Sequence, residues 1–99
     1  MLNTLETICI VSAQHYNITL GQLKSDCRKK EYNLARIHAI LIFTELHKEA
    51  TLGLIGRYLS DRVHCSIIHA KKNGIKKLKS DTAFAYLHKA IKTEVLKLI

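Results

Sequence analysis

A cysteine and two histidines lie close together near the middle of the chain, at His64, Cys65 and His69. Such side chains can ligate zinc, and a thiol beside a histidine can act as a nucleophile. The spacing of five residues places the histidines on different faces of a helix, whereas zinc-binding pairs prefer a spacing of four. No acidic residue that could orient His64 is evident beside it. We therefore predict no metal site, no cofactor and no catalytic residue here, and we predict that the chain is not an enzyme.

The run from Arg62 to Ser66 offers a different chemistry, which is the recognition of base edges and phosphates. Arg62 can bind a phosphate or the acceptors of guanine, and His64 can donate a hydrogen bond to either a base or a phosphate. Val63 can lie against a thymine methyl group, and Ser66 can donate or accept. The cysteine between them fits as a small contact residue. This set predicts a DNA-reading tip if it opens a helix.

An excess of positive charge supports the same interpretation. Lys and Arg number 16 against 8 acidic residues, which gives a formal net charge of +8. A surplus of this size favours a polyanionic partner, with nucleic acid first and an anionic membrane surface second. From Arg62 onward nine basic residues stand against two acidic ones, and a second basic cluster runs from Arg28 to Lys30. We expect Lys71 and Lys72, which follow the tip, to bind flanking phosphates.

The apolar spacing of the elements that must position these residues is helical almost throughout, so we predict an all-α fold. The predicted helices run from about Leu2 to Tyr16–Asn17, over a short segment capped by Thr19, over 31–48, over 51–59 with Thr51 as cap, over 64–78, and from Ser80–Asp81 onward. A helix of about two turns, a short turn and a longer helix form the outline of a helix-turn-helix. The second helix of such a unit offers its N-terminal residues to the major groove.

The long helix over 31–48 is apolar nearly all round, so we expect it to be central and buried. Within it, His38 is expected to pack against a local hydrogen-bond partner rather than to ligate a metal. Asn73-Gly74 is predicted to weaken the helix over 64–78, because glycine disfavours helix interiors. The inward residues predicted in the other helices are Leu2, Leu5, Ile8, Cys9, Ser12 and Ala13, then Leu20 and Leu23, then Leu52, Ile55 and Leu59, then Ile67, Ile68, Ile75 and Leu78, and finally Phe84, Leu87, Ile91, Val95 and Leu98.

Cysteine usage and hydropathy bear on the compartment. Cys9, Cys27 and Cys65 are an odd number without zinc-finger spacing, which favours reduced thiols in a cytosolic protein. The N-terminus lacks the basic segment and unbroken apolar run of a signal peptide, and no stretch has the length of a membrane span. We predict one helix-turn-helix DNA-binding domain over residues 1–99, cytoplasmic and associated with the nucleoid rather than with a membrane.

Several short motifs between Val11 and Lys72 match one family pattern. They are Tyr16-x-Ile18 with Leu23, Ala35-Arg36 with Glu45-Leu46, Leu52-x-x-Ile55-Gly56, and Arg62-Val63-His64-Cys65-Ser66-Ile67-Ile68-His69-Ala70. With these motifs the chain resembles the C-terminal DNA-binding domain (domain IV) of the bacterial replication initiator DnaA. In that family the last motif reads Arg-Asp-His, two small hydroxyl residues, two aliphatic residues, His and Ala. The resemblance implies a compact domain of about six helices of the TrpR-like, DnaA C-terminal type.

The resemblance also implies binding to double-stranded DNA and roles for particular residues. Arg28 would enter the minor groove from a basic loop, while the residues from Arg62 to Ser66 would touch bases and phosphates in the major groove. His69 and Ala70, further along the same helix, are expected to pack rather than to touch bases. The candidate DNA-binding residues are Arg28, Lys29, Lys30, Arg36, Arg62, Val63, His64, Cys65, Ser66, Lys71 and Lys72.

Departures from the family pattern predict an altered sequence preference. Val63 stands where the family has a base-reading aspartate, and Cys65 stands where it has a hydroxyl residue. The paired glycines before the arginine are Ser60-Asp61 here, and the segment 46–52 is one residue longer. Losing the aspartate removes an acceptor for the amino group of cytosine or adenine. We therefore predict that the chain does not favour the standard initiator box.

The glycines are scattered, and no Gly-Lys-Ser/Thr phosphate loop is present, so we expect a DNA-binding module without ATP hydrolysis or origin melting. One alternative from another class stays open, in which the chain is a protein-interaction module that modulates the host initiator or replication machinery. The last helix, with Tyr86 and His88 beside its apolar stripe, would then be a partner or dimer surface. We expect it instead to close the core. The sequence leaves the oligomeric state open.

Overall fold

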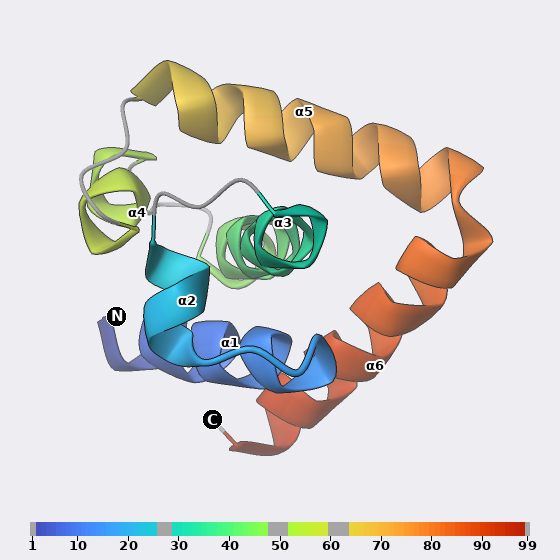
Figure 1. The fold of residues 1–99 in the computed structure, drawn as a ribbon, viewed down its shortest axis with the longest axis horizontal. Helices are drawn as coiled ribbons and strands as arrows, with labels where there is room; N and C mark the ends of the chain where they lie inside the picture. Colours follow the sequence, from blue (N-terminus) through green and yellow to red (C-terminus); the bar gives the residue numbers. More distant parts are fainter. Residues whose placement is uncertain (1, 26–28, 48–51, 60–63, 99) are drawn as a thin grey trace.

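The helix α3 (Lys30–Leu46) lies at the centre of the fold, with the other helices arranged around it (Figure 1). A computed structural model describes residues 2–25, 29–47, 52–59 and 64–98. Within these ranges the chain forms six helices and no strand, which confirms the predicted all-α fold. Besides α3, the helices are α1 (Leu2–His15), α2 (Leu20–Lys24), α4 (Leu52–Tyr58), α5 (His64–Ser80) and α6 (Thr82–Leu98).

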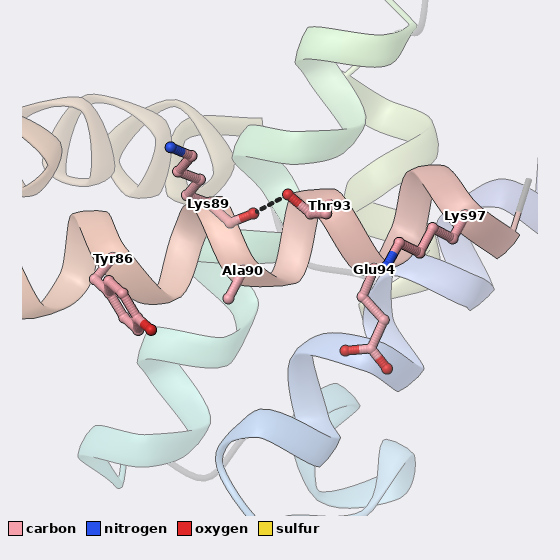
Figure 2. A pocket seen from close by; sticks show the side chains of 6 residues that line it. All are labelled: Tyr86, Lys89, Ala90, Thr93, Glu94 and Lys97. Atoms are coloured by element: carbon pink, nitrogen blue, oxygen red, sulfur yellow. Dashed lines mark hydrogen bonds between the residues drawn. The ribbon is translucent and has the colours of Figure 1, made fainter.

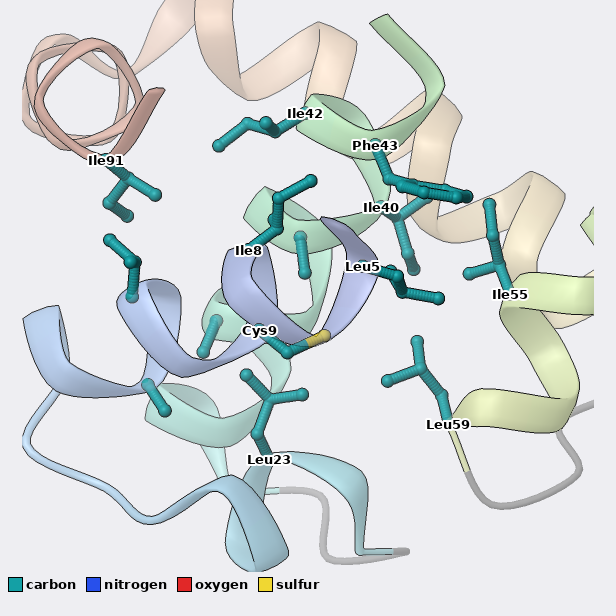
Figure 3. Close-up of a cluster of buried hydrophobic side chains, with 14 of the residues drawn as sticks. Leu5, Ile8, Cys9, Leu23, Ile40, Ile42, Phe43, Ile55, Leu59 and Ile91 are labelled. Atoms are coloured by element: carbon teal, nitrogen blue, oxygen red, sulfur yellow. The ribbon is translucent and has the colours of Figure 1, made fainter. Parts of the chain in front are cut away.

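The central position of α3 follows from its composition. Nine consecutive residues from Ala35 to Phe43 are buried, so the helix has no solvent-facing side along its middle. A helix that is apolar all round must be covered on every side, and α1 and α5 cover opposite sides of it (Figure 1). The prediction of a buried central helix is therefore confirmed. Its main core cluster also takes in residues of α1, α2, α4, α5 and α6, including Leu5, Leu23, Ile55, Ile67 and Ile91 (Figure 3).

Local hydrogen bonds turn the chain between α1 and α2. The Ile18 and Asn17 amides donate to the carbonyls of Ala13 and Gln14, while Asn17 adopts a positive φ of 56°. This arrangement closes a helix C-terminus, and asparagine tolerates the left-handed conformation that it needs. Thr19 then caps α2, because its hydroxyl accepts from the Gln22 amide and its own amide donates to the Gln22 side chain. The predicted helix end and the predicted cap are both confirmed.

The helix α5 passes through Gly74 without a break, so the predicted weak spot is wrong. A Cβ atom at this position would lie 2.6 Å from both Ile37 Cγ2 and Leu41 Cδ1 of α3. Glycine is therefore required here for a close approach of two helices. The gain in packing outweighs the roughly 1 kcal/mol that glycine costs a helix relative to alanine.

The helix α6 closes the core, as predicted, but with a different set of residues. Phe84, Ile91 and Val95 are buried as expected, and Asp81 caps the helix by accepting from the Phe84 amide at 3.1 Å. His88 is buried as well. Two expected core residues are wrong, because Leu98 is 62% exposed and Ile75 of α5 is 42% exposed. Leu98 is the last residue of α6, and Ile75 lines a surface groove on α5. Thr51 and the side chains of Leu2 and Leu52 lie outside the described residues.

Candidate nucleic-acid interface

The pair α4 and α5 forms the predicted helix-turn-helix. Ile55 and Leu59 in the α4 segment and Ile67 in the second turn of α5 are fully or almost fully buried in the main core cluster. Their packing anchors both helices in the main core cluster, so the start of α5 is held by the core. Arg62 and Val63 lie outside the described residues, as do the side chains of His64, Cys65 and Ser66 in the first turn of α5. The contact roles expected for these residues stay predictions.

Beyond its first turn, α5 carries an outer face, of which Lys72 was predicted from the sequence as a phosphate contact. His69, Lys72, Asn73 and Lys76 are all exposed, and together with Ile75 they line one groove. The spacing of 69, 72, 73 and 76 places them on one side of a helix. Continuing this helical periodicity from the predicted tip at Arg62 to Ser66 could have identified these residues from the sequence. His69 is exposed, so the expectation that it packs inward is wrong, whereas Ala70 does pack against the core.

The charge of α5 is of one sign. The helix contains no acidic residue, and its five lysines are Lys71, Lys72, Lys76, Lys77 and Lys79. Of the two lysines expected to bind phosphate, Lys72 is exposed on the outer face and Lys71 is partly buried. A row of lysines without acidic neighbours on its own helix produces a positive potential that attracts a phosphate backbone. The outer face of α5, defined as His69, Lys72, Asn73 and Lys76, therefore combines positive charge with side chains that can donate hydrogen bonds.

The second basic region lies at the start of α3. Lys29 and Lys30 are exposed there, and Lys29 Nζ lies 5.7 Å from the ring centroid of Tyr32. The first turn of a helix carries partial positive charge from its unpaired amide groups, which adds to the charge of the lysines. Arg28, which the resemblance places in the minor groove, lies outside the described residues.

Arg36 takes a different place from the other basic candidates, because it is only 4% exposed. Its Nε donates to the Leu23 carbonyl at 2.5 Å, and its Nη2 donates to the Ser25 carbonyl at 2.6 Å. A guanidinium that is buried among backbone carbonyls is not presented to a duplex in this structure. We therefore no longer expect Arg36 to contact DNA directly. Its hydrogen bonds instead connect the end of α2, and the residue that follows it, to α3.

A second groove runs along α6 (Figure 2). Its lining residues all come from α6 and are Tyr86, Lys89, Ala90, Thr93, Glu94 and Lys97. Tyr86 is 75% exposed, as a partner surface would require. His88, which was expected beside it, instead points into the core and is only 7% exposed.

Searches of the described residues for other kinds of site give two findings. Among those residues, no group of three or more His, Cys, Asp or Glu side chains is placed to hold a metal ion. None of the helices in the same part of the chain is long and apolar enough to cross a membrane.

Comparison with known proteins then decides the family. The family described as "Bacterial dnaA protein helix-turn-helix" matches residues 5–73, which run from α1 into α5. The chain belongs to this family. The DnaA resemblance given by the motifs between Val11 and Lys72 is therefore confirmed, and with it the DNA-binding helix-turn-helix.

Individual DnaA proteins are similar over almost the entire chain. The chromosomal replication initiator protein DnaA of Nautilia profundicola is 38% identical over 94 residues, which cover 95% of this chain and 20% of that protein. The DnaA proteins of Geotalea daltonii and Symbiobacterium thermophilum are 33% and 34% identical over 94% and 84% of this chain. The chain spans about a fifth of the length of these curated DnaA relatives.

Proposed function

We propose that the chain binds double-stranded DNA with the start of α5 in the major groove and the basic segment before α3 at the minor groove or backbone. The observation that carries this proposal is the outer face of α5, where His69, Lys72, Asn73 and Lys76 continue the predicted tip along one side of the helix. A recognition helix reads bases with its N-terminal residues, while positions further along bind the flanking backbone. Membership of the DnaA helix-turn-helix family supports the same mode of binding.

Within this proposal Arg36 is a positioning residue. Its two hydrogen bonds hold the carbonyls of Leu23 and Ser25, which immediately precede the segment that contains Arg28. Hydrogen bonds from a charged donor are each worth about 1.5–3 kcal/mol, so they restrict where that segment can begin. Lys29 and Lys30 then follow at the other end of the segment, on the exposed start of α3.

We further propose that the sequence preference differs from that of DnaA relatives with the family pattern. Val63 cannot accept a hydrogen bond from a base amino group, so specificity would move to the remaining donors and to the thymine methyl group. We also propose that the chain has no ATPase activity of its own, because its sequence contains no Gly-Lys-Ser/Thr phosphate loop.

The decisive experiment measures binding to random duplexes and to the standard initiator box at two salt concentrations. With about four phosphate contacts, affinity should fall roughly a hundredfold between about 50 and 200 mM salt. The two kinds of duplex should bind with similar affinity. Sequencing duplexes selected from a random pool would then define the preferred site.

Two outcomes would contradict the proposal in different ways. A strong preference for the standard box would refute the altered specificity and leave DNA binding intact. Failure to bind any duplex at low salt would refute DNA binding. That result would support the protein-interaction alternative, for which the exposed Tyr86 in the groove on α6 is the best candidate surface.

A further inference from the structure

A chain of four polar side chains crosses the interior between α1, α3 and α6. The Tyr16 hydroxyl lies 2.8 Å from His38 Nε2, and His38 Nδ1 lies 3.1 Å from His88 Nδ1. On the far side, His88 Nε2 lies 3.4 Å from the Glu45 carboxylate. We call these residues the histidine chain. No part of the proposed DNA interface uses it, although two buried histidines in contact are uncommon and need a physical account.

One assignment of protons places a donor opposite an acceptor at both hydrogen bonds of the histidine chain while both imidazoles are neutral, and it turns the His88 Nε2–H, which makes no hydrogen bond by geometry, toward Glu45. Tyr16 donates to His38 Nε2, His38 Nδ1–H donates to His88 Nδ1, and His88 Nε2–H points toward the Glu45 carboxylate. The opposite direction would leave a bare His88 nitrogen facing a carboxylate, which is repulsive. Burial favours neutral imidazoles in the first place, since His38 is fully buried and His88 almost so.

Added protons disturb this arrangement in two steps. After the first proton is added, one Nδ1 atom can still donate to the other. This step therefore costs the burial of one charge, but the hydrogen bonds remain. A second proton makes both rings imidazolium ions and places two N–H groups against each other at the 3.1 Å contact. Two buried like charges at this distance repel strongly. The histidine chain therefore cannot persist with both rings charged.

We propose that the histidine chain is a proton-dependent latch, which holds α6 against α3 while the histidines are neutral and releases it when both are charged. The proposal concerns the free protein and stands apart from DNA binding. The geometry explains why release would act on α6: His38 belongs to α3, and His88 belongs to α6, whose first turn also places Phe84 on the His38 ring at a centroid distance of 4.1 Å. Charging the pair would disturb both the polar and the aromatic contacts between these helices.

The charged groups around the latch have opposing effects on the pKa values of its histidines. Burial lowers the pKa of His38 to about 3, with further contributions from His88 and from His15 of α1. Burial also lowers the pKa of His88, while Glu45 raises it and Lys92 lowers it. Glu45 is itself held by Lys92 at 2.7 Å, and His15 is paired with Glu94 at 2.8 Å. Burial, with a smaller contribution from Asp81, raises the pKa of Tyr16 to about 12, which keeps its hydroxyl a donor.

The direction of the pH effect follows from these shifts. A free histidine in the unfolded chain takes up a proton near pH 6.5, whereas the buried pair resists protonation. The unfolded state therefore binds more protons below about pH 6.5, and stability falls as the pH drops toward the lowered pKa values. His38, whose pKa is lowered to about 3, should raise the unfolding equilibrium constant by about 25-fold between pH 7 and pH 5, and the lowered pKa of His88 adds an effect in the same direction.

The test compares urea unfolding of the full chain at pH 7 and pH 5 with that of His38→Gln/His88→Gln. Glutamine can accept and donate at similar positions but does not titrate. The unfolding constant of the original chain should rise by at least about 25-fold over this range, and the double variant should lose most of that rise. His69→Gln, which removes an exposed histidine, is the matched control and should keep the rise. An equal rise in the double variant would overturn the proposal.

Two further measurements keep the proposal testable if the double variant folds poorly. Ring-proton titration by NMR on the original chain should show His38 neutral down to about pH 5 and His88 titrating below its ordinary range, and titration of both near 6.5 would overturn the latch. Hydrogen exchange, corrected for its intrinsic pH dependence, should show α6 amides opening earlier than α3 amides on acidification. Uniform opening of both helices would overturn the specific release of α6.

Discussion

The helices α5 and α6 are neighbours of equal length, 17 residues each, yet they use their charged residues in opposite ways. In α6 the acidic groups are engaged with the rest of the fold. Glu94 pairs with His15 of α1, and Asp81 caps the helix itself. Lys92 of α6 in turn pairs with Glu45 of α3. In α5 the five lysines have no acidic residue on their own helix. The difference indicates that the charge of α6 supports the fold, whereas the charge of α5 is available to a polyanion.

The two helices also differ in how they attach to α3. Gly74 lets the backbone of α5 approach Ile37 and Leu41 closely, so this contact is apolar and depends on shape. The contact of α6 includes the polar pair His38 and His88. An apolar contact is insensitive to pH and salt, while a polar contact responds to both. An apolar contact, such as the one between α5 and α3, therefore suits a helix that must keep its orientation on DNA.

The largest expected effect tests the difference in charge. Lys72→Glu/Lys76→Glu on α5 should weaken binding to all duplexes by roughly a thousandfold, since each reversal replaces an attraction of about 1 kcal/mol by a comparable repulsion and the two sites together cost about 4 kcal/mol. Lys89→Glu/Lys97→Glu on α6 makes the same change in net charge and should alter affinity by less than about threefold. Fluorescence anisotropy with a labelled duplex measures both. Equal losses of affinity in the two variants would mean that only net charge matters, and would refute the proposed difference between α5 and α6.

A smaller effect tests the attachment of α5. Gly74→Ala should destabilise the protein by about 1–2 kcal/mol, because overpacking against Ile37 and Leu41 outweighs the higher helix propensity of alanine. Gly21→Ala is the matched control, since a Cβ there meets only the Thr19 hydroxyl at 3.8 Å. Urea denaturation followed by circular dichroism gives both values. A more stable Gly74→Ala variant would show that the close approach is not required.

The cap of α6 should affect stability without affecting DNA binding. Asp81→Ala removes the acceptor for the Phe84 amide and should cost about 1 kcal/mol. Ser80→Ala, one residue earlier, removes an exposed hydroxyl that donates to the Lys76 carbonyl and should be nearly neutral. Duplex affinity should stay unchanged in both variants under conditions where they are folded. A loss of affinity in Asp81→Ala alone would show that α6 supports the interface more directly.

The smallest expected effect concerns the ion pair between Lys92 and Glu45, whose side chains are both partly exposed. Because water screens such a pair, Lys92→Gln should cost no more than about 0.5 kcal/mol, and high salt should remove the difference. Lys89→Gln on the same helix serves as the control. Denaturation at low and high salt provides the measurement. A larger loss that persists at high salt would mean that Lys92 is essential to the latch.

Much of the fold could be predicted from local patterns. The 3.6-residue spacing of apolar residues located all six helices, and the Thr19 cap was identified from its residue type and position. The helix-turn-helix and the start of its second helix at His64 were also predicted correctly. Beyond the first turn of α5, Lys72 was predicted to bind phosphate, but the outer face to which it belongs was not identified. Lys76 was not placed beside Lys72 by helical periodicity, and His69 was expected to pack.

The sequence by itself determined the helices, the central place of α3 and the family, because apolar periodicity and short motifs are local properties. Tertiary structure decided which exceptions to those patterns matter. Gly74 looked like a defect until α3 was found against it, and Arg36 looked like a DNA contact until its guanidinium was found on the carbonyls of Leu23 and Ser25. His38 and His88 are 50 residues apart and meet only when α6 folds back on α3. Such pairings depend on how helices cross, which no local pattern specifies.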